Sequence, residues 1–66
     1  MNITVNGQKR ELPHSVNLDF LVQEFCRDAK HIVAEVNGAI VRQNRWTDKE
    51  ITEGDVIELV NFVGGG

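Results

Sequence analysis

Three consecutive glycines, Gly64, Gly65 and Gly66, end the sequence and are its strongest candidates for chemistry. Glycine has no Cβ and occupies backbone conformations that other residues avoid, so we expect a slim, mobile segment. A carboxylate on Gly66 would have no side chain beside its reacting carbon. Because its negative charge is delocalised, a carboxylate is a poor electrophile until a good leaving group is attached. The tail therefore fits an arm that enters a narrow active site on another protein.

The cysteine and the two histidines have simpler interpretations. Cys26 directly follows the apolar Phe25, and we expect it to be a small, partly buried packing residue rather than a sulfur acceptor. His14 and His31 are far apart in the sequence and have no third ligand nearby. The sequence therefore predicts no metal site.

Four carboxylates and one tryptophan lie between the middle of the chain and its last apolar run. Asp48, Glu50, Glu53 and Asp55 could pair as acid and base, but no apolar pocket surrounds them to shift a pKa. We predict that they lie in a solvated loop. Trp46 could anchor a partner, yet packing beneath that loop is favoured because the chain has few large side chains.

Length and charge narrow the classes of function. Sixty-six residues predict one domain over residues 1–66, with 64–66 as its flexible tail. A net charge of −3 argues against nucleic acid and anionic membranes as partners. No apolar run approaches the roughly 20 residues of a membrane span, and residues 1–4 do not resemble a signal peptide. Together with a single cysteine, these features predict a cytoplasmic protein.

The elements that must position the tail follow from the hydrophobic pattern. Asn-Gly pairs at 6–7 and 37–38 predict two tight hairpins between short strands. Between them, apolar residues at i, i+3, i+4 and i+7 predict one amphipathic helix from Leu18 to about Arg27, with Asn17 as its N-cap. A final strand over 56–63 then leads into the glycines.

This order predicts an α+β fold, in which a mixed sheet of four to five strands carries one main helix. If the last strand lies parallel to the first, the result is a β-grasp (ubiquitin-like) sheet, although another small α+β roll is possible. The expected core is Leu18, Leu21, Val22, Phe25, Ile3, Val5, Ile32, Val36, Ile57 and Leu59. Alternation along the last strand places Val60 and Phe62 on the opposite face. Val60 and Phe62 are expected to form an exposed apolar patch that binds a partner. Val33 on a neighbouring strand and Val63 beside the tail are expected to belong to the same patch.

The sequence also resembles a known protein family. The chain resembles the ubiquitin-like sulfur carriers, and within them the ThiS family of thiamine (thiazole) biosynthesis. The matching stretches are Val36-Asn37-Gly38, Ile40-Val41-Arg42, Trp46, Glu53-Gly54-Asp55-Val56-Ile57-Glu58 and Phe62-Val63-Gly64-Gly65-Gly66. The terminal glycines on so short a chain are the specific part.

The resemblance implies a protein cosubstrate rather than an enzyme. An E1-like (ThiF-like) adenylating enzyme would use ATP and magnesium to activate Gly66, while this chain binds no cofactor. Sulfur from a persulfide donor would then give a thiocarboxylate, which donates sulfur to a ThiG-like thiazole synthase. Two alternatives stay open: a sulfur carrier of another pathway, such as the small subunit of molybdopterin synthase, and a ubiquitin-like protein modifier.

Overall fold

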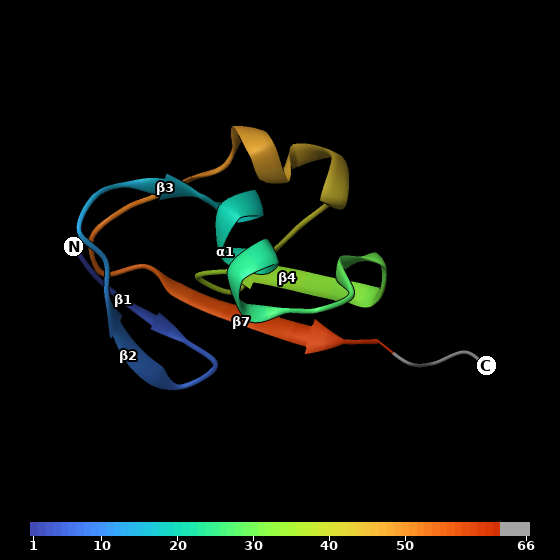
Figure 1. Ribbon diagram of the computed structural model, residues 1–66, viewed down its shortest axis with the longest axis horizontal. Helices are drawn as coiled ribbons and strands as arrows, with labels where there is room; N and C mark the ends of the chain where they lie inside the picture. The colour runs from blue at the N-terminus through green and yellow to red at the C-terminus, as the bar shows by residue number, and fades with distance from the viewer. Residues whose placement is uncertain (63–66) are drawn as a thin grey trace.

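A five-stranded mixed sheet with one helix across it forms the framework of residues 1–62, which the computed structural model describes (Figure 1). The strand order is β2-β1-β7-β4-β5. Its strands are β1 (Asn2–Val5), β2 (Gln8–Glu11), β4 (Ile32–Val36), β5 (Ala39–Val41) and β7 (Val56–Asn61). The first and last strands are parallel and all other neighbours are antiparallel. The predicted β-grasp fold is confirmed.

The two Asn-Gly hairpins form where the sequence predicts them. Asn6 and Gly7 have φ values of 50° and 80°, and Asn37 and Gly38 have φ values of 53° and 86°. Positive φ at both central residues is the signature of the turn that matches the twist of a two-residue hairpin. Thus β1 pairs with β2, and β4 pairs with β5, through short local turns.

Helix α1 (Leu18–Phe25) crosses one face of the sheet and ends two residues before its predicted end. The side chain of Asn17 accepts a hydrogen bond from the backbone N–H of Phe20 at 2.8 Å, which confirms the predicted cap. The helix stops because Cys26 has an extended backbone. Phe25 lies in the last turn, so it sits at the rim of the core with 40% of its surface exposed, and its core assignment is wrong.

The core between α1 and the sheet is completed by residues after β5. The short helix η2 (Gln43–Asp48) carries Trp46, which is buried and donates its indole N–H to the carbonyl of Val41 at 2.9 Å. Packing of Trp46 is thereby confirmed. Ala34 and Ile51 are also buried, whereas Ile32, predicted in the core, is only partly buried.

Three short elements lack a clear signal in the sequence. Strands β3 (Val16–Asn17) and β6 (Glu50–Ile51) pair beside α1, and η1 (Ala29–His31) leads into β4.

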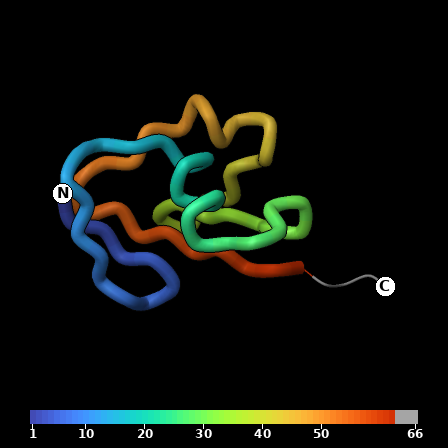
Figure 2. The backbone as a smooth tube through the Cα atoms, in the orientation of Figure 1, coloured from blue at the N-terminus to red at the C-terminus, as the bar shows by residue number. Residues whose placement is uncertain are grey.

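The start of the chain and the end of β7 lie at opposite ends of the long axis (Figure 2). Within residues 1–62, no helix combines the length and apolar character that crossing a membrane requires.

Candidate functional site

The candidate site lies where β7 delivers the chain to its last residues. β7 is the central strand of the sheet, held by β1 on one side and by β4 on the other. Pairing with β4 continues to Asn61, which faces Ile32, and the backbone N–H of Phe62 donates to the carbonyl of His31. The last described residue is therefore still anchored to the sheet. Val63, the predicted end of the last strand, and the predicted tail over 64–66 lie outside the described residues.

Strand register defines the side chains that face away from α1. Residues directly opposite one another on neighbouring strands share a face. Val33 is opposite Val60, Glu35 is opposite both Glu58 and Ile40, and Thr4 is opposite both Val56 and Lys9. We call this surface the outer sheet face, and its members are Asn2, Thr4, Lys9, Glu11, Val33, Glu35, Ile40, Val56, Glu58 and Val60.

The end of the outer sheet face beside the chain exit is apolar. Val60 is 53% exposed and Phe62, which continues the alternation of β7, is 62% exposed. The predicted exposure of these two residues is confirmed. Val33 is only partly buried rather than exposed, because its strand lies between β5 and β7 and it faces Val60 directly. Partner binding at this patch stays a prediction.

Two glutamates interrupt this apolar surface. Glu35 and Glu58 are directly opposite each other on β4 and β7, an arrangement in which like charges destabilise a sheet. Within residues 1–62 neither carboxylate forms a salt bridge. A positively charged group placed over the pair would relieve the repulsion.

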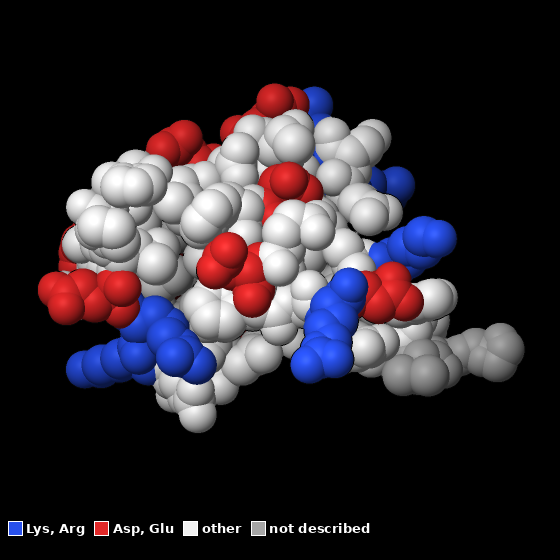
Figure 3. Space-filling view, viewed as in Figure 1, with Lys and Arg blue, Asp and Glu red and all other residues white. Residues whose placement is uncertain are grey.

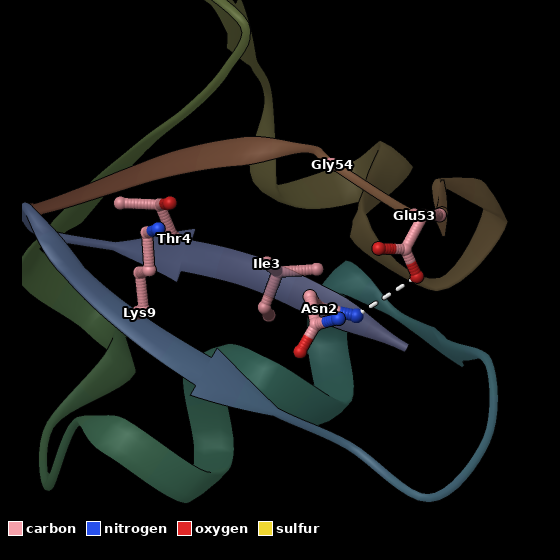
Figure 4. Close-up of a pocket in the computed structure, with 6 residues that line it drawn as sticks. All are labelled: Asn2, Ile3, Thr4, Lys9, Glu53 and Gly54. Carbon is pink, nitrogen blue, oxygen red and sulfur yellow. Dashed lines mark hydrogen bonds between the residues drawn. The ribbon is translucent and has the colours of Figure 1, made fainter.

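The opposite end of the outer sheet face is polar. Figure 4 shows Thr4 and Lys9 side by side on neighbouring strands, and the backbone N–H of Asn2 donating to Glu53 Oε1 at 2.9 Å. These residues, with Gly54, line an open hollow of about 410 Å³. Val56, which begins β7 opposite Thr4, is also 44% exposed. β7 thus presents an exposed apolar side chain near each end, and Val60 is the one beside the exit of the chain.

A buried carboxylate fixes the start of β7. Asp55 is 9% exposed. It accepts hydrogen bonds from the backbone N–H of Thr52 at 2.9 Å and from the amide of Asn37 at 3.0 Å. Burial by itself raises the pKa of Asp55, but the hydrogen bonds from Thr52 and Asn37 outweigh it and hold the pKa below its ordinary value. The predicted solvated loop is therefore wrong for Asp55, although Asp48, Glu50 and Glu53 are exposed.

Asparagines from the two hairpin turns hold β7 from both sides, a role that the sequence reading missed. Asn37 Oδ1 accepts from the N–H of Val56 at 2.9 Å, and Asn6 Oδ1 accepts from the N–H of Leu59 at 2.8 Å. Each side-chain amide thus satisfies a backbone N–H of the strand that leads to the tail. The Asn-Gly motif signals the turn but carries no information on these distant partners.

The cysteine and the histidines are not brought together. Cys26 is partly buried against the core, as predicted, and burial raises the pKa of its thiol. His31 Nδ1 lies 3.2 Å from Asp28 Oδ2, while His14 Nδ1 lies 3.1 Å from the carbonyl of Ser15. Across residues 1–62, no three His, Cys, Asp or Glu side chains gather in a way that could hold a metal ion.

Known proteins are similar to this chain in sequence and in fold. A crystal structure of a thiamine biosynthesis protein (ThiS) from Geobacter metallireducens superposes with a TM-score of 0.88 at 29% identity, over 100% of both chains. The sulfur carrier protein ThiS of Bacillus subtilis is 37% identical over 70% of this chain and 70% of its own length. A thiazole synthase of Paramagnetospirillum magneticum is 30% identical over the whole of this chain, which spans only 20% of that protein. The model of the ThiS family matches residues 3–66, and the chain belongs to that family.

Proposed function

We propose that this protein is a sulfur carrier in the biosynthesis of the thiazole of thiamine, and that the carboxylate of Gly66 carries the sulfur. The observation that supports this most strongly is the family match, which extends through the three glycines to residue 66. The names of the Bacillus and Geobacter relatives point to the same pathway. On this proposal the chain is a cosubstrate, and its partners supply the catalytic groups.

The proposed chemistry has three balanced steps. A carboxylate oxygen of Gly66 attacks the α-phosphorus of ATP, bound with Mg²⁺ on an E1-like adenylating enzyme, and pyrophosphate leaves. The terminal sulfur of a protein persulfide then attacks the acyl carbon and displaces AMP, which gives an acyl disulfide. A thiol cleaves that disulfide, releasing the thiocarboxylate and forming a disulfide with the donor. Gly64 and Gly65 provide access because they add no side chain to the path.

The outer sheet face is the proposed docking surface for the adenylating enzyme. Val60 and Phe62 are exposed and lie on the strand that leads directly to Gly66, with Val33 beside them; we include Val63 as their continuation. Exposed apolar patches mark interaction sites. A patch in this position would place the tail at the entrance of the partner's active site.

The charge on this face adds a chemical requirement for the partner. Glu35 and Glu58 face each other within the patch without a cation from this chain among residues 1–62. An arginine or lysine of the partner, seated over both carboxylates, would replace repulsion by attraction. We therefore infer an interface with an apolar centre and a basic contact beside it.

Thiazole synthase is the proposed recipient of the sulfur. A Paramagnetospirillum relative that bears this name contains a segment similar to the whole of this chain. Such an arrangement is expected where a carrier and its synthase work together, since a covalent link raises their effective concentration.

Reconstitution with variants of the tail tests the proposal. The protein is incubated with the adenylating enzyme, ATP, Mg²⁺ and a sulfide source, and intact-mass spectrometry detects replacement of one oxygen by sulfur. Deleting Gly66 should abolish the conversion. Appending one alanine should also abolish it, because the reacting carbon moves by about 3.5 Å and gains a side chain.

Gly65→Val is the matched test of access. It keeps the terminal carboxylate but restricts the backbone next to it, so conversion should slow while the melting temperature stays unchanged. If the alanine-extended protein is thiolated as fast as the parent, Gly66 is not the reacting residue and the proposal fails.

A further inference from the structure

The two edges of the five-stranded sheet differ in how they are protected. β2 forms one edge, and three of its four residues, Lys9, Arg10 and Glu11, are charged and exposed. Charged side chains on an edge prevent another strand from pairing with it. β5 forms the other edge and consists of Ala39, Ile40 and Val41, with no charged residue. β5 is thus the edge that has no charged side chain to block pairing with another strand.

The backbone of Ile40 points toward solvent at this edge. In a two-residue hairpin the residues that flank the turn, here Val36 and Ala39, form a hydrogen-bonded pair. Ile40 is the next residue, so its N–H and C=O point away from β4. Among residues 1–62 neither group finds a partner elsewhere. The Ile40 side chain is 66% exposed on the outer sheet face.

A basic groove runs beside this edge. It has a volume of about 370 Å³, and its lining is Ile40, Val41, Arg42, Arg45, Asp48 and Lys49. Within residues 1–62 none of its three cations forms a salt bridge with a carboxylate. Figure 3 shows Lys and Arg side chains flanking η2 at the upper right of the molecule. The groove thus carries an excess of positive charge on a chain whose net charge is −3.

We propose that the β5 edge and this groove bind an extended acidic segment of a partner protein. The backbone of the segment pairs with the N–H and C=O of Ile40 and so adds a sixth strand to the sheet. Its carboxylates face Arg42, Arg45 and Lys49. Because β5 has only three residues, backbone pairing is short, and charge complementarity must supply much of the specificity. A second copy of this chain is not the occupant, since a symmetric pairing would bring two sets of these cations together.

This surface is independent of Gly66, so it can be tested without any sulfur chemistry. The probe is a capped synthetic peptide of alternating valine and glutamate, titrated into the isotope-labelled full chain and followed by NMR. Its control has the same length with lysine in place of glutamate. The Val/Glu peptide should shift the amide resonances of Ile40 and Arg45 saturably and slow hydrogen exchange at Ile40. Binding should weaken as salt is added.

Matched variants identify the surface. Arg45→Glu should weaken binding of the Val/Glu peptide by about threefold or more, since the substitution replaces attraction to the glutamates by repulsion. Ile40→Pro removes the outward N–H from an edge position where proline is tolerated, so it should weaken binding of the Val/Glu peptide, as followed by the amide resonance of Arg45. Lys9→Glu makes the same kind of charge reversal on the β2 edge and should leave binding unchanged.

Each of the following results would overturn the proposal. These are equal binding of the lysine peptide, equal weakening by Lys9→Glu and Arg45→Glu, shifts confined to Val60 and Phe62, and an absence of shifts at roughly millimolar peptide. A short oligothymidylate that occupies the groove more tightly than the Val/Glu peptide would also refute the choice of a polypeptide partner.

Discussion

The substitution Phe62→Ala tests whether this side chain contributes to partner binding as well as to the stability of the fold. Phe62 is 62% exposed, and complete burial of a phenylalanine contributes about 1.5–3 kcal/mol. If the free energy scales with the buried surface, the part of Phe62 that is already buried contributes about 0.6–1.1 kcal/mol to folding. Burial of the exposed part by a partner would contribute about 0.9–1.9 kcal/mol more to binding. Phe62→Ala should therefore raise the dissociation constant for the adenylating enzyme by about 5- to 25-fold.

The assay measures the two quantities on the same samples. Calorimetric titration with the adenylating enzyme gives the dissociation constant, and urea denaturation gives the free energy of unfolding. The control is Phe20→Ala: Phe20 is 47% exposed but lies on α1, away from the outer sheet face. Because Phe20 has slightly more of its surface buried, this variant should lose about as much stability, or a little more, and bind the enzyme as the parent does.

Either of two results would contradict the assignment of Phe62 to the docking surface. One is an unchanged dissociation constant for Phe62→Ala together with a loss of more than about 2 kcal/mol in stability, which would make Phe62 a core residue. The other is equal weakening of binding by Phe62→Ala and Phe20→Ala, which would place the interface on the helix side.

Three further predictions concern stability. Leu21→Ala empties a fully buried position and should lower the free energy of unfolding by about 2–5 kcal/mol; a variant that melts like the parent would show that the helix face is assigned wrongly. Asp55 has a folded pKa below its ordinary value, so its charged form stabilises the fold above about pH 4, and that contribution is lost as the pH falls through the folded pKa. Asp55→Asn should thus lower the free energy of unfolding at pH 7 by about 1–3 kcal/mol. Urea denaturation at decreasing pH should show the difference in free energy of unfolding between variant and parent becoming smaller, and a difference that persists in acid would contradict this. Glu58→Lys removes the repulsion with Glu35 and should raise stability by about 0.2–1 kcal/mol while weakening binding to the adenylating enzyme, and stronger binding would argue against a basic contact there.

The local signals in the sequence predict most of the fold. The stripe of Leu18, Leu21 and Val22 defines the buried face of α1, and the Asn-Gly pairs define both hairpins. Alternation along β7 separates Ile57 and Leu59, which are buried, from the exposed residues beside the tail. These signals succeed because each depends only on the period of an element or on the conformation of a turn.

The features that sequence reasoning misses depend on contacts between distant segments. Phe25 matches the helical stripe, but the helix ends there and the guanidinium of Arg10 lies 5.3 Å from the centre of its ring. Asp55 looks like a loop carboxylate until Asn37, 18 residues away, supplies its hydrogen bond. Strands β3 and β6 have two residues each, too few to show a period. The same holds for the candidate site. The exposure of Val60 and Phe62 is predicted from the alternation along the strand. That Glu35 lies opposite Glu58 can be known only from the strand register.

The most direct test of the central claim is the intact mass of the protein isolated from the cells that naturally make it. The cells are grown without thiamine and lack thiazole synthase, so that a charged carrier has no acceptor, and a thiol-reactive reagent traps the product during lysis. The proposed function predicts a species with one oxygen replaced by sulfur, and fragmentation should place the sulfur on Gly66. Only the free acid under these conditions, or conjugates to lysines of other proteins, would contradict it.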